Sequence, residues 1–121
     1  MMGRLALAAV AFAALAGSVP AQEATRAPGA VLRLLDKTAG QVEDVDLFTG
    51  QVAQLGGIDI AMGECRYPSG NPSGDAFARL DITERDGGET LFSGWMIASS
   101  PALSALDHAR YDVWVLRCKT S

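Results

Sequence analysis

Residues 91–118 read LFSGWMIASSPALSALDHARYDVWVLRC, the stretch of the sequence that says most about the architecture. It holds both tryptophans, the single histidine and one of the two cysteines of the chain. Residues 90–98 and 111–118 are rich in apolar, aromatic and β-branched side chains, which predicts two strands. Between them a serine pair precedes Pro101, a pattern typical of a helix start, so we expect one short helical turn over residues 101–106.

Both predicted strands carry apolar side chains on both faces. In the first strand, Leu91, Trp95 and Ile97 alternate with Phe92 and Met96. Strands with two apolar faces are usually covered on both, so we expect central strands. Because one helical turn covers little of the second face, we also expect a partner protein to complete the cover.

Residues 76–98 predict a β hairpin that turns at residues 86–88. Ala78, Leu80 and Ile82 alternate with polar side chains, and the turn supplies Asp-Gly-Gly, in which glycine accepts a positive φ. We expect this hairpin to be the longest element of the domain.

Three further strands are predicted upstream, at residues 30–36, 42–47 and 58–65, and a short piece at residues 51–55 lies between two glycine breaks. The first of these would also suit a short helix, but the turn chemistry at residues 37–40 favours a strand. The chain is therefore expected to be all-β, a small antiparallel β sandwich or barrel of about six to eight strands.

The first 21 residues predict a cleaved signal peptide. A basic start precedes an apolar run at residues 5–16, which is shorter than the roughly 20 residues that a membrane-spanning helix needs. We expect cleavage after Ala21 and export to the periplasm. Residues 22–29 are then a flexible lead-in, and residues 30–121 form a single domain.

The charge of the chain is acidic. It has 10 lysines and arginines against 14 acidic residues, a formal net charge of −4, and loss of Arg4 with the signal peptide makes this −5. No basic cluster accompanies this balance, which argues against nucleic acid and against anionic membrane surfaces as partners. We expect no membrane span after signal cleavage.

Cys65 and Cys118 predict one disulfide, because paired cysteines in a small exported domain usually bond to each other. They lack the short Cys-x-x-Cys spacing of redox pairs. In the chain-entropy model, closing a loop of this length would stabilise the domain by roughly 4 kcal/mol.

Ser99, Ser100, Asp107 and His108 include the residue types of a nucleophilic triad, but they lie within ten residues of one another. A structural role is the stronger interpretation: a serine caps the turn, and Asp107 and His108 close it through the backbone. We therefore predict no enzyme activity, no cofactor and no metal site.

Several motifs are shared with a known family: CRYP at 65–68, FSGWM at 92–96, ASSP at 98–101, LDH at 106–108 and YDVWVLRC at 111–118. With them, residues 31–118 resemble the DUF2155 family, small exported proteins of alphaproteobacteria. The resemblance implies a periplasmic location and a paired-cysteine β domain, and it transfers no catalytic or ligand residues. Genes of this family tend to lie beside one that encodes an accessory subunit of respiratory NADH:ubiquinone oxidoreductase.

Two functions follow as expectations. The first is a non-catalytic interaction protein, an accessory subunit that docks on the periplasmic face of an inner-membrane complex. Its candidate interface comprises aromatic and neighbouring residues: Tyr67, Trp95, Pro101, Leu103, Leu106, His108 and Tyr111. The alternative is a small-molecule or glycan-binding module that uses the loop at residues 66–75, with Tyr67 and a tryptophan as a stacking platform.

Overall fold

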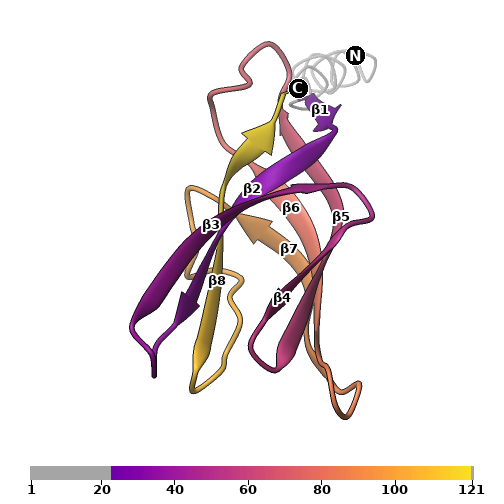
Figure 1. Ribbon diagram of the computed structural model, residues 1–121. Coiled ribbons are helices and arrows are strands. Elements are labelled where there is room, and N and C mark those ends of the chain that lie inside the picture. Colours follow the sequence, from indigo (N-terminus) through magenta and orange to yellow (C-terminus); the bar gives the residue numbers. More distant parts are fainter. Residues whose placement is uncertain (1–22, 121) are drawn as a thin grey trace, which may run out of the picture.

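The computed structural model describes residues 23–120, which Figure 1 shows as strands joined by loops. These residues form eight strands: β1 (Ala24–Ala27), β2 (Gly29–Asp36), β3 (Gln41–Phe48), β4 (Val52–Leu55), β5 (Ile58–Pro68), β6 (Phe77–Glu84), β7 (Thr90–Ile97) and β8 (Tyr111–Lys119). The described part contains no helix, so the expected all-β class is confirmed. The predicted signal peptide lies outside the described residues.

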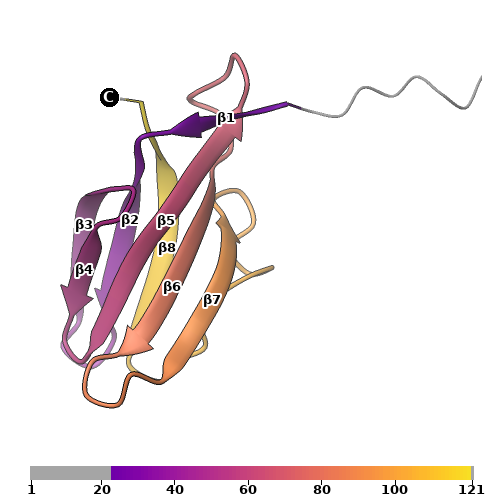
Figure 2. The same ribbon diagram turned by 90° about the vertical axis from the view of Figure 1, so that its right-hand side faces the viewer.

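The strands make two antiparallel sheets. The larger sheet has the order β1-β5-β6-β7, with β4 paired to β5 beside β1, and the smaller has the order β3-β2-β8. In Figure 2 the smaller sheet lies behind the larger one, so the described residues form two layers. The sheets do not close on each other, so of the two expected architectures the sandwich holds and the barrel does not.

The core lies between the two sheets. Ile58, Ile60 and Met62 of β5 are at most 1% exposed, as their alternation predicted, and the inward residues of β6 are fully buried. Leu32 and Leu34 of β2 meet them from the smaller sheet. Each such large aliphatic side chain stabilises the fold by about 1.5–3 kcal/mol when buried.

Three register shifts interrupt the strand pairing, and one of them lies where Ile82 and Thr83 of β6 pair with Phe92 and Thr90 of β7. In β5 the register shifts between Met62 and Glu64, and in β8 it shifts where Val115 and Arg117 pair with β2. A bulge adds one residue to one strand of a pair, so the residues beyond it change face. Cys65 and Cys118 therefore both point inward.

The two strands expected at the centre, β7 and β8, are instead edge strands of the larger and smaller sheets. No third layer covers their second apolar face among the described residues, and the side chains on that face are half-buried or exposed. Pro101 from the loop before β8 lines a hollow together with Trp114 and Leu116, so the chain itself shields part of this face.

The expected helical turn at residues 101–106 is wrong. The segment between β7 and β8 is an irregular loop with two tight turns, closed by 3.1 Å hydrogen bonds from Ser100 N to Ile97 O and from Leu103 N to Ser100 O. Ser99 does not cap a helix, because its N–H and hydroxyl both bind Asp75. An extended path also lets Leu106 reach the core while Leu103 stays exposed.

Two boundaries also differ from expectation. Residues 22–29 were expected to be a flexible lead-in, but Ala24–Ala27 form β1 and pair with the end of β5. This pairing extends β5 to Pro68, so the expected loop at residues 66–75 begins three residues later. The hairpin β6–β7 is confirmed, but β5, with 11 residues, is the longest strand.

Candidate functional site

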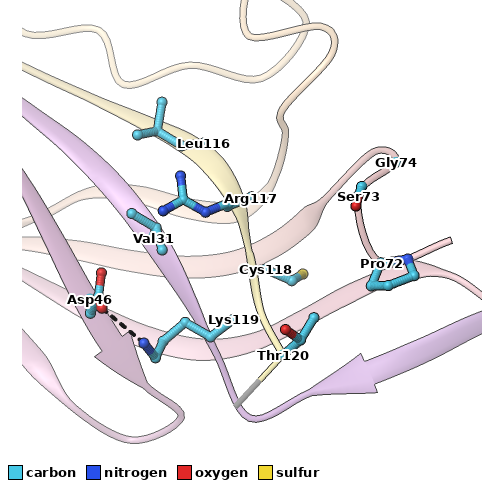
Figure 3. Close-up of a pocket in the computed structure, with 10 residues that line it drawn as sticks. All are labelled: Val31, Asp46, Pro72, Ser73, Gly74, Leu116, Arg117, Cys118, Lys119 and Thr120. Carbon is cyan, nitrogen blue, oxygen red and sulfur yellow. Dashed lines mark hydrogen bonds and ion pairs between the residues drawn. The ribbon is translucent and has the colours of Figure 1, made fainter.

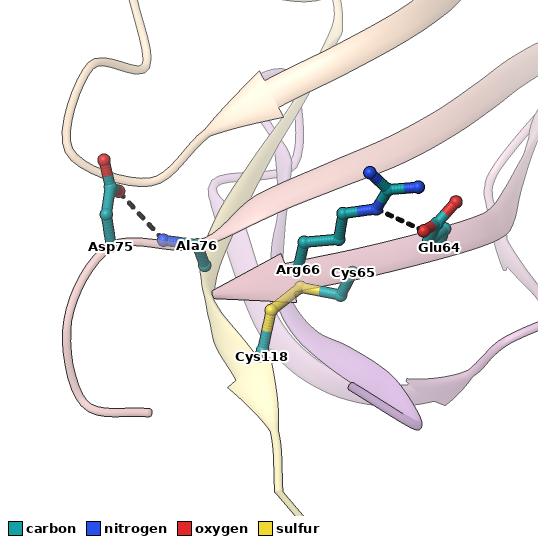
Figure 4. The surroundings of a disulfide bond; sticks show 6 residues. All are labelled: Glu64, Cys65, Arg66, Asp75, Ala76 and Cys118. Atoms are coloured by element: carbon teal, nitrogen blue, oxygen red, sulfur yellow. Dashed lines mark hydrogen bonds and ion pairs between the residues drawn. A yellow bond between two sulfur atoms is a disulfide. The ribbon is translucent and has the colours of Figure 1, made fainter. Parts of the chain in front are cut away.

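The disulfide joins the two sheets at one end of the sandwich. Figure 4 shows Cys65 of β5 bonded to Cys118 of β8, with Cα atoms 5.8 Å apart. The predicted pairing is therefore confirmed. Both residues are at most 5% exposed and belong to the core. The arrangement suits a structural bond.

The start of β8 is held by His108. The ring nitrogen Nδ1 of His108 accepts hydrogen bonds from the N–H groups of Arg110 and Tyr111, at 3.0 and 3.2 Å. The histidine thus closes the loop through the backbone as predicted, whereas Asp107, which was expected to do the same, makes no side-chain hydrogen bond among the described residues. Ser99 binds Asp75 through its hydroxyl at 2.6 Å, so the described residues do not assemble a triad around His108.

Asp36 at the end of β2 is the second anchor of this region. Its carboxylate accepts hydrogen bonds from Nε and Nη2 of Arg110, at 3.2 and 3.1 Å, and from the N–H groups of Thr38 and Ala39. The hydrogen bond from Arg110 lowers the pKa of Asp36 below its ordinary value, and the backbone N–H of Ala39 adds to this.

The candidate interface residues do not form one surface. Leu106 and Tyr111 are only 6% exposed and belong to the core, and Tyr67 packs against the core from its edge. Leu103 is 77% exposed on the loop before β8, whereas Trp95 is 38% exposed on the larger sheet. Of the seven, Trp95 is the exposed aromatic.

Trp95 sits in a shallow apolar depression on the outer face of the larger sheet. This depression, which we call the Trp95 hollow, has a volume of about 260 Å³ and crosses four strands. It is lined by Ala24, Arg66, Phe77, Trp95 and Ile97. Sequence reasoning missed Ala24, Phe77 and Ile97 as neighbours, because only the pairing of β1, β5, β6 and β7 brings them together.

Arg66 borders the Trp95 hollow. The guanidinium carbon of Arg66 lies 5.4 Å from the centre of the Trp95 ring, a cation–π distance. Arg66 and Arg26 both donate to Glu64, and the hydrogen bond from Arg66 lowers the pKa of that carboxyl. Figure 4 shows the Arg66–Glu64 pair beside the disulfide.

A second, more polar groove lies at the end of β8. Its volume is about 490 Å³, and it is lined by Pro72, Ser73 and Gly74 of the long loop and by Arg117 and Lys119 of β8, among others (Figure 3). Lys119 donates a 2.9 Å hydrogen bond to Asp46 across the groove. We call it the Arg117 groove.

Two further properties concern residues 23–120. They contain no cluster of three or more histidine, cysteine or acidic residues with the geometry of a metal site. No helix long and apolar enough to cross a membrane occurs in this part of the chain.

Fold and site together define an antiparallel two-sheet β domain whose sheets are joined by one buried disulfide. Residues 30–118 match the family described as "Uncharacterized protein conserved in bacteria (DUF2155)", and the chain belongs to this family.

Uncharacterized protein RP359 of Rickettsia prowazekii (strain Madrid E) is 30% identical over 87 residues, which cover 69% of this chain and 56% of that protein. The chain thus spans little more than half the length of this relative. No solved structure matches the chain.

Proposed function

We propose that this chain is a non-catalytic, exported interaction protein whose β domain docks on a partner protein. The observation that carries the proposal is the Trp95 hollow, where a half-exposed tryptophan lies among apolar side chains with an arginine against its ring. Tryptophan and arginine are the residues most enriched at the centres of protein interfaces. Leu106 and Tyr111, by contrast, are buried in the core and are not part of the proposed interface.

The partner is proposed to be an inner-membrane complex reached from the periplasm. The signal-peptide pattern of residues 1–21 and the disulfide support export to an oxidising compartment. Respiratory NADH:ubiquinone oxidoreductase is the complex that the gene neighbourhood of the family suggests.

The test is native electrophoresis of detergent-solubilised membranes from cells that carry an epitope-tagged chain. We expect the tag to migrate with a large complex, and Trp95→Lys to release the protein while leaving its thermal unfolding midpoint within a few degrees of wild type. Val42→Lys is the control, because Val42 is also exposed but lies on the smaller sheet, in β3. A wild-type protein that migrates as a free monomer would contradict the proposal.

The Arg117 groove favours a second candidate, a binding module for a small anionic molecule or glycan. Arg117, Lys119, Ser73 and Thr120 supply converging donors there. Tyr67 packs toward the core instead of lining this groove, so it offers no stacking platform. Calorimetric titration with uronic acids and sugar phosphates tests this candidate, with Arg117→Ala expected to abolish any heat of binding.

A further inference from the structure

The outer edge of β7 carries main-chain groups that β6 does not use. Ala98 N donates to Ala76 O at 2.9 Å, so these two residues form a hydrogen-bonded pair. Directly opposed pairs in an antiparallel ladder alternate between bonded and non-bonded. Counting along the register, Ser93 and Trp95 are in non-bonded pairs, so their N–H and C=O groups point away from β6.

These groups lack another backbone partner within residues 23–120. Backbone hydrogen bonds from loops reach Ile97 O, which accepts from Ser100 N, but none involves Ser93 or Trp95. Figure 2 shows β7 as the outermost strand of the larger sheet. A row of unpaired donors and acceptors on an edge strand is a template for another strand.

The sequence of β7 does nothing to block such pairing. The strand reads TLFSGWMI and contains neither a charged residue nor a proline. By contrast, β3, an edge of the smaller sheet, carries Glu43, Asp44 and Asp46. Because proteins normally protect edge strands with charges or prolines, the unprotected edge is expected to have a partner.

We propose that β7 is the docking edge for an extended segment of a partner protein, which adds to the larger sheet as a further strand. This inference rests on the proposed interaction function and specifies its chemistry. Main-chain hydrogen bonds to Ser93 and Trp95 hold the segment, and one large apolar side chain enters the Trp95 hollow. That hollow begins on β7 itself, with Trp95 and Ile97.

The charges around the Trp95 hollow indicate the composition of the segment. Arg66 lies against Trp95, and Arg79 is opposite Trp95 in the register and binds Ser93 Oγ at 2.8 Å. Arg66 shares Glu64 with Arg26, and Arg79 pairs with Asp81 at 3.4 Å. Three arginines therefore face two carboxylates, and an acidic side chain next to the large apolar one complements the remaining positive charge. A second copy of this chain would present β7, which has no acidic residue, so a different protein is the better occupant.

Two pairs of variants isolate the edge and the hollow. Ser93→Pro removes the outward N–H without touching the β6 ladder, and Ser93→Ala is its control because both variants lose the side-chain hydrogen bonds of Ser93. Trp95→Lys places a charge in the hollow, and Val42→Lys places one on the other sheet. Thermal unfolding with the disulfide intact confirms that each variant is folded.

The probe is a phage-displayed random heptapeptide library panned on the full exported chain. We expect enriched peptides with a large apolar residue beside Asp or Glu, and we expect them to protect the Ser93 and Trp95 amides from hydrogen exchange. Ser93→Pro and Trp95→Lys should weaken binding roughly tenfold or more, whereas the two controls should bind like wild type. Absence of enrichment, or equal binding by Ser93→Pro and Ser93→Ala, overturns the inference.

Two other results are also decisive. Concentration-dependent protection of the same amides without peptide would show that a second copy is the occupant, which overturns the inference in favour of self-pairing. In native membrane extracts, a Ser93→Pro protein that stays in the large complex refutes the edge but leaves the interaction function standing. A wild-type monomer there refutes the function instead.

Discussion

Single side chains fix the junction where β8 begins. The Tyr111 hydroxyl accepts a 3.1 Å hydrogen bond from Gly57 N, and the Arg110 guanidinium lies 5.3 Å from the Tyr111 ring centre while it holds Asp36. His108 accepts from the two backbone N–H groups between these contacts. A buried aromatic, an ion pair and a backbone cap thus come from three residues within residues 108–111, and each can be tested by itself.

The Asp36–Arg110 pair predicts an acid-sensitive stability. Because the pKa of Asp36 is lower in the folded than in the unfolded state, its stabilisation is present above the unfolded pKa of about 3.9 and is lost as pH falls through the folded value. Asp36→Asn should therefore lose stability near neutral pH and unfold with a smaller dependence on pH below about 5. Urea unfolding between pH 7 and 3 measures this.

Asp107→Asn is the control for that experiment, since the Asp107 side chain has no hydrogen-bond partner among the described residues. It should unfold like the wild type across the same pH range. Asp44, Glu64 and Asp75 also have lowered pKa values, so these groups make both proteins less stable in acid. The contribution of Asp36 is therefore the difference between the pH dependence of wild-type stability and that of Asp36→Asn. Parallel curves for wild type and Asp36→Asn would contradict the assignment.

Gly56 is expected to tolerate no side chain. Its φ is +52°, and a Cβ atom there would lie 2.0 Å from the Tyr111 hydroxyl oxygen. Gly56→Ala should therefore lower the free energy of unfolding by about 1–3 kcal/mol, through backbone strain and displacement of Tyr111. Gly57→Ala is a matched control, because a Cβ on Gly57 meets no atom within 4 Å. Chemical denaturation of both variants measures the contrast.

At the scale of strands, alternation predicted the core faces of β5 and β6 correctly, because side-chain direction in a strand follows directly from sequence. The positions of β7 and β8 could not be obtained that way. Two-sided apolar patterns arise in central strands, but also in an edge strand whose outer face forms a binding surface. Strand order depends on pairing between distant segments, and β1 pairs with β5 across about 40 residues of sequence.

The bulges in β5 and β8 were equally invisible in the pattern, yet they decide whether the disulfide forms. Gly63 occupies the bulge of β5, where Arg79 packs within 3.1 Å of the position that its Cβ would take. Met62 and Cys65 both point inward only because one residue is added between them.

Deletion of Gly63 is therefore expected to turn Cys65 to the outer face and prevent its bond to Cys118. Thiol counting by alkylation and intact mass should find two free cysteines in the exported deletion variant. Deletion of Gly70, in the loop that follows β5, is the control and should leave the disulfide intact, because that loop lies outside the strands. A bonded pair in the Gly63 deletion would show that the register can slip to compensate.

At the level of the whole molecule, the disulfide lies beneath the proposed docking surface. Cys65 pairs with Ala78, which pairs with Met96, so the bonded cysteine and the Trp95 hollow lie on opposite faces of the same three strands. The disulfide also ties the larger sheet to β8, near the end of the described chain. A domain of this size buries a limited core, so one covalent link is a large part of its stability.

Removing the disulfide tests how much of the stability of the domain depends on it. Cys65→Ala with Cys118→Ala is expected to lose about 4 kcal/mol of unfolding free energy, because 53 positions separate the two cysteines and the unfolded chain regains that loop. Equilibrium denaturation of the double variant and of the oxidised wild type measures this difference. The loss approaches the whole stability of a small domain, so we expect the variant, and the wild type made in a reducing cytosol, to be largely unfolded near 37 °C. A variant as stable as the oxidised wild type would show that the two sheets hold together through the core alone, and that the docking surface does not depend on the bond beneath it.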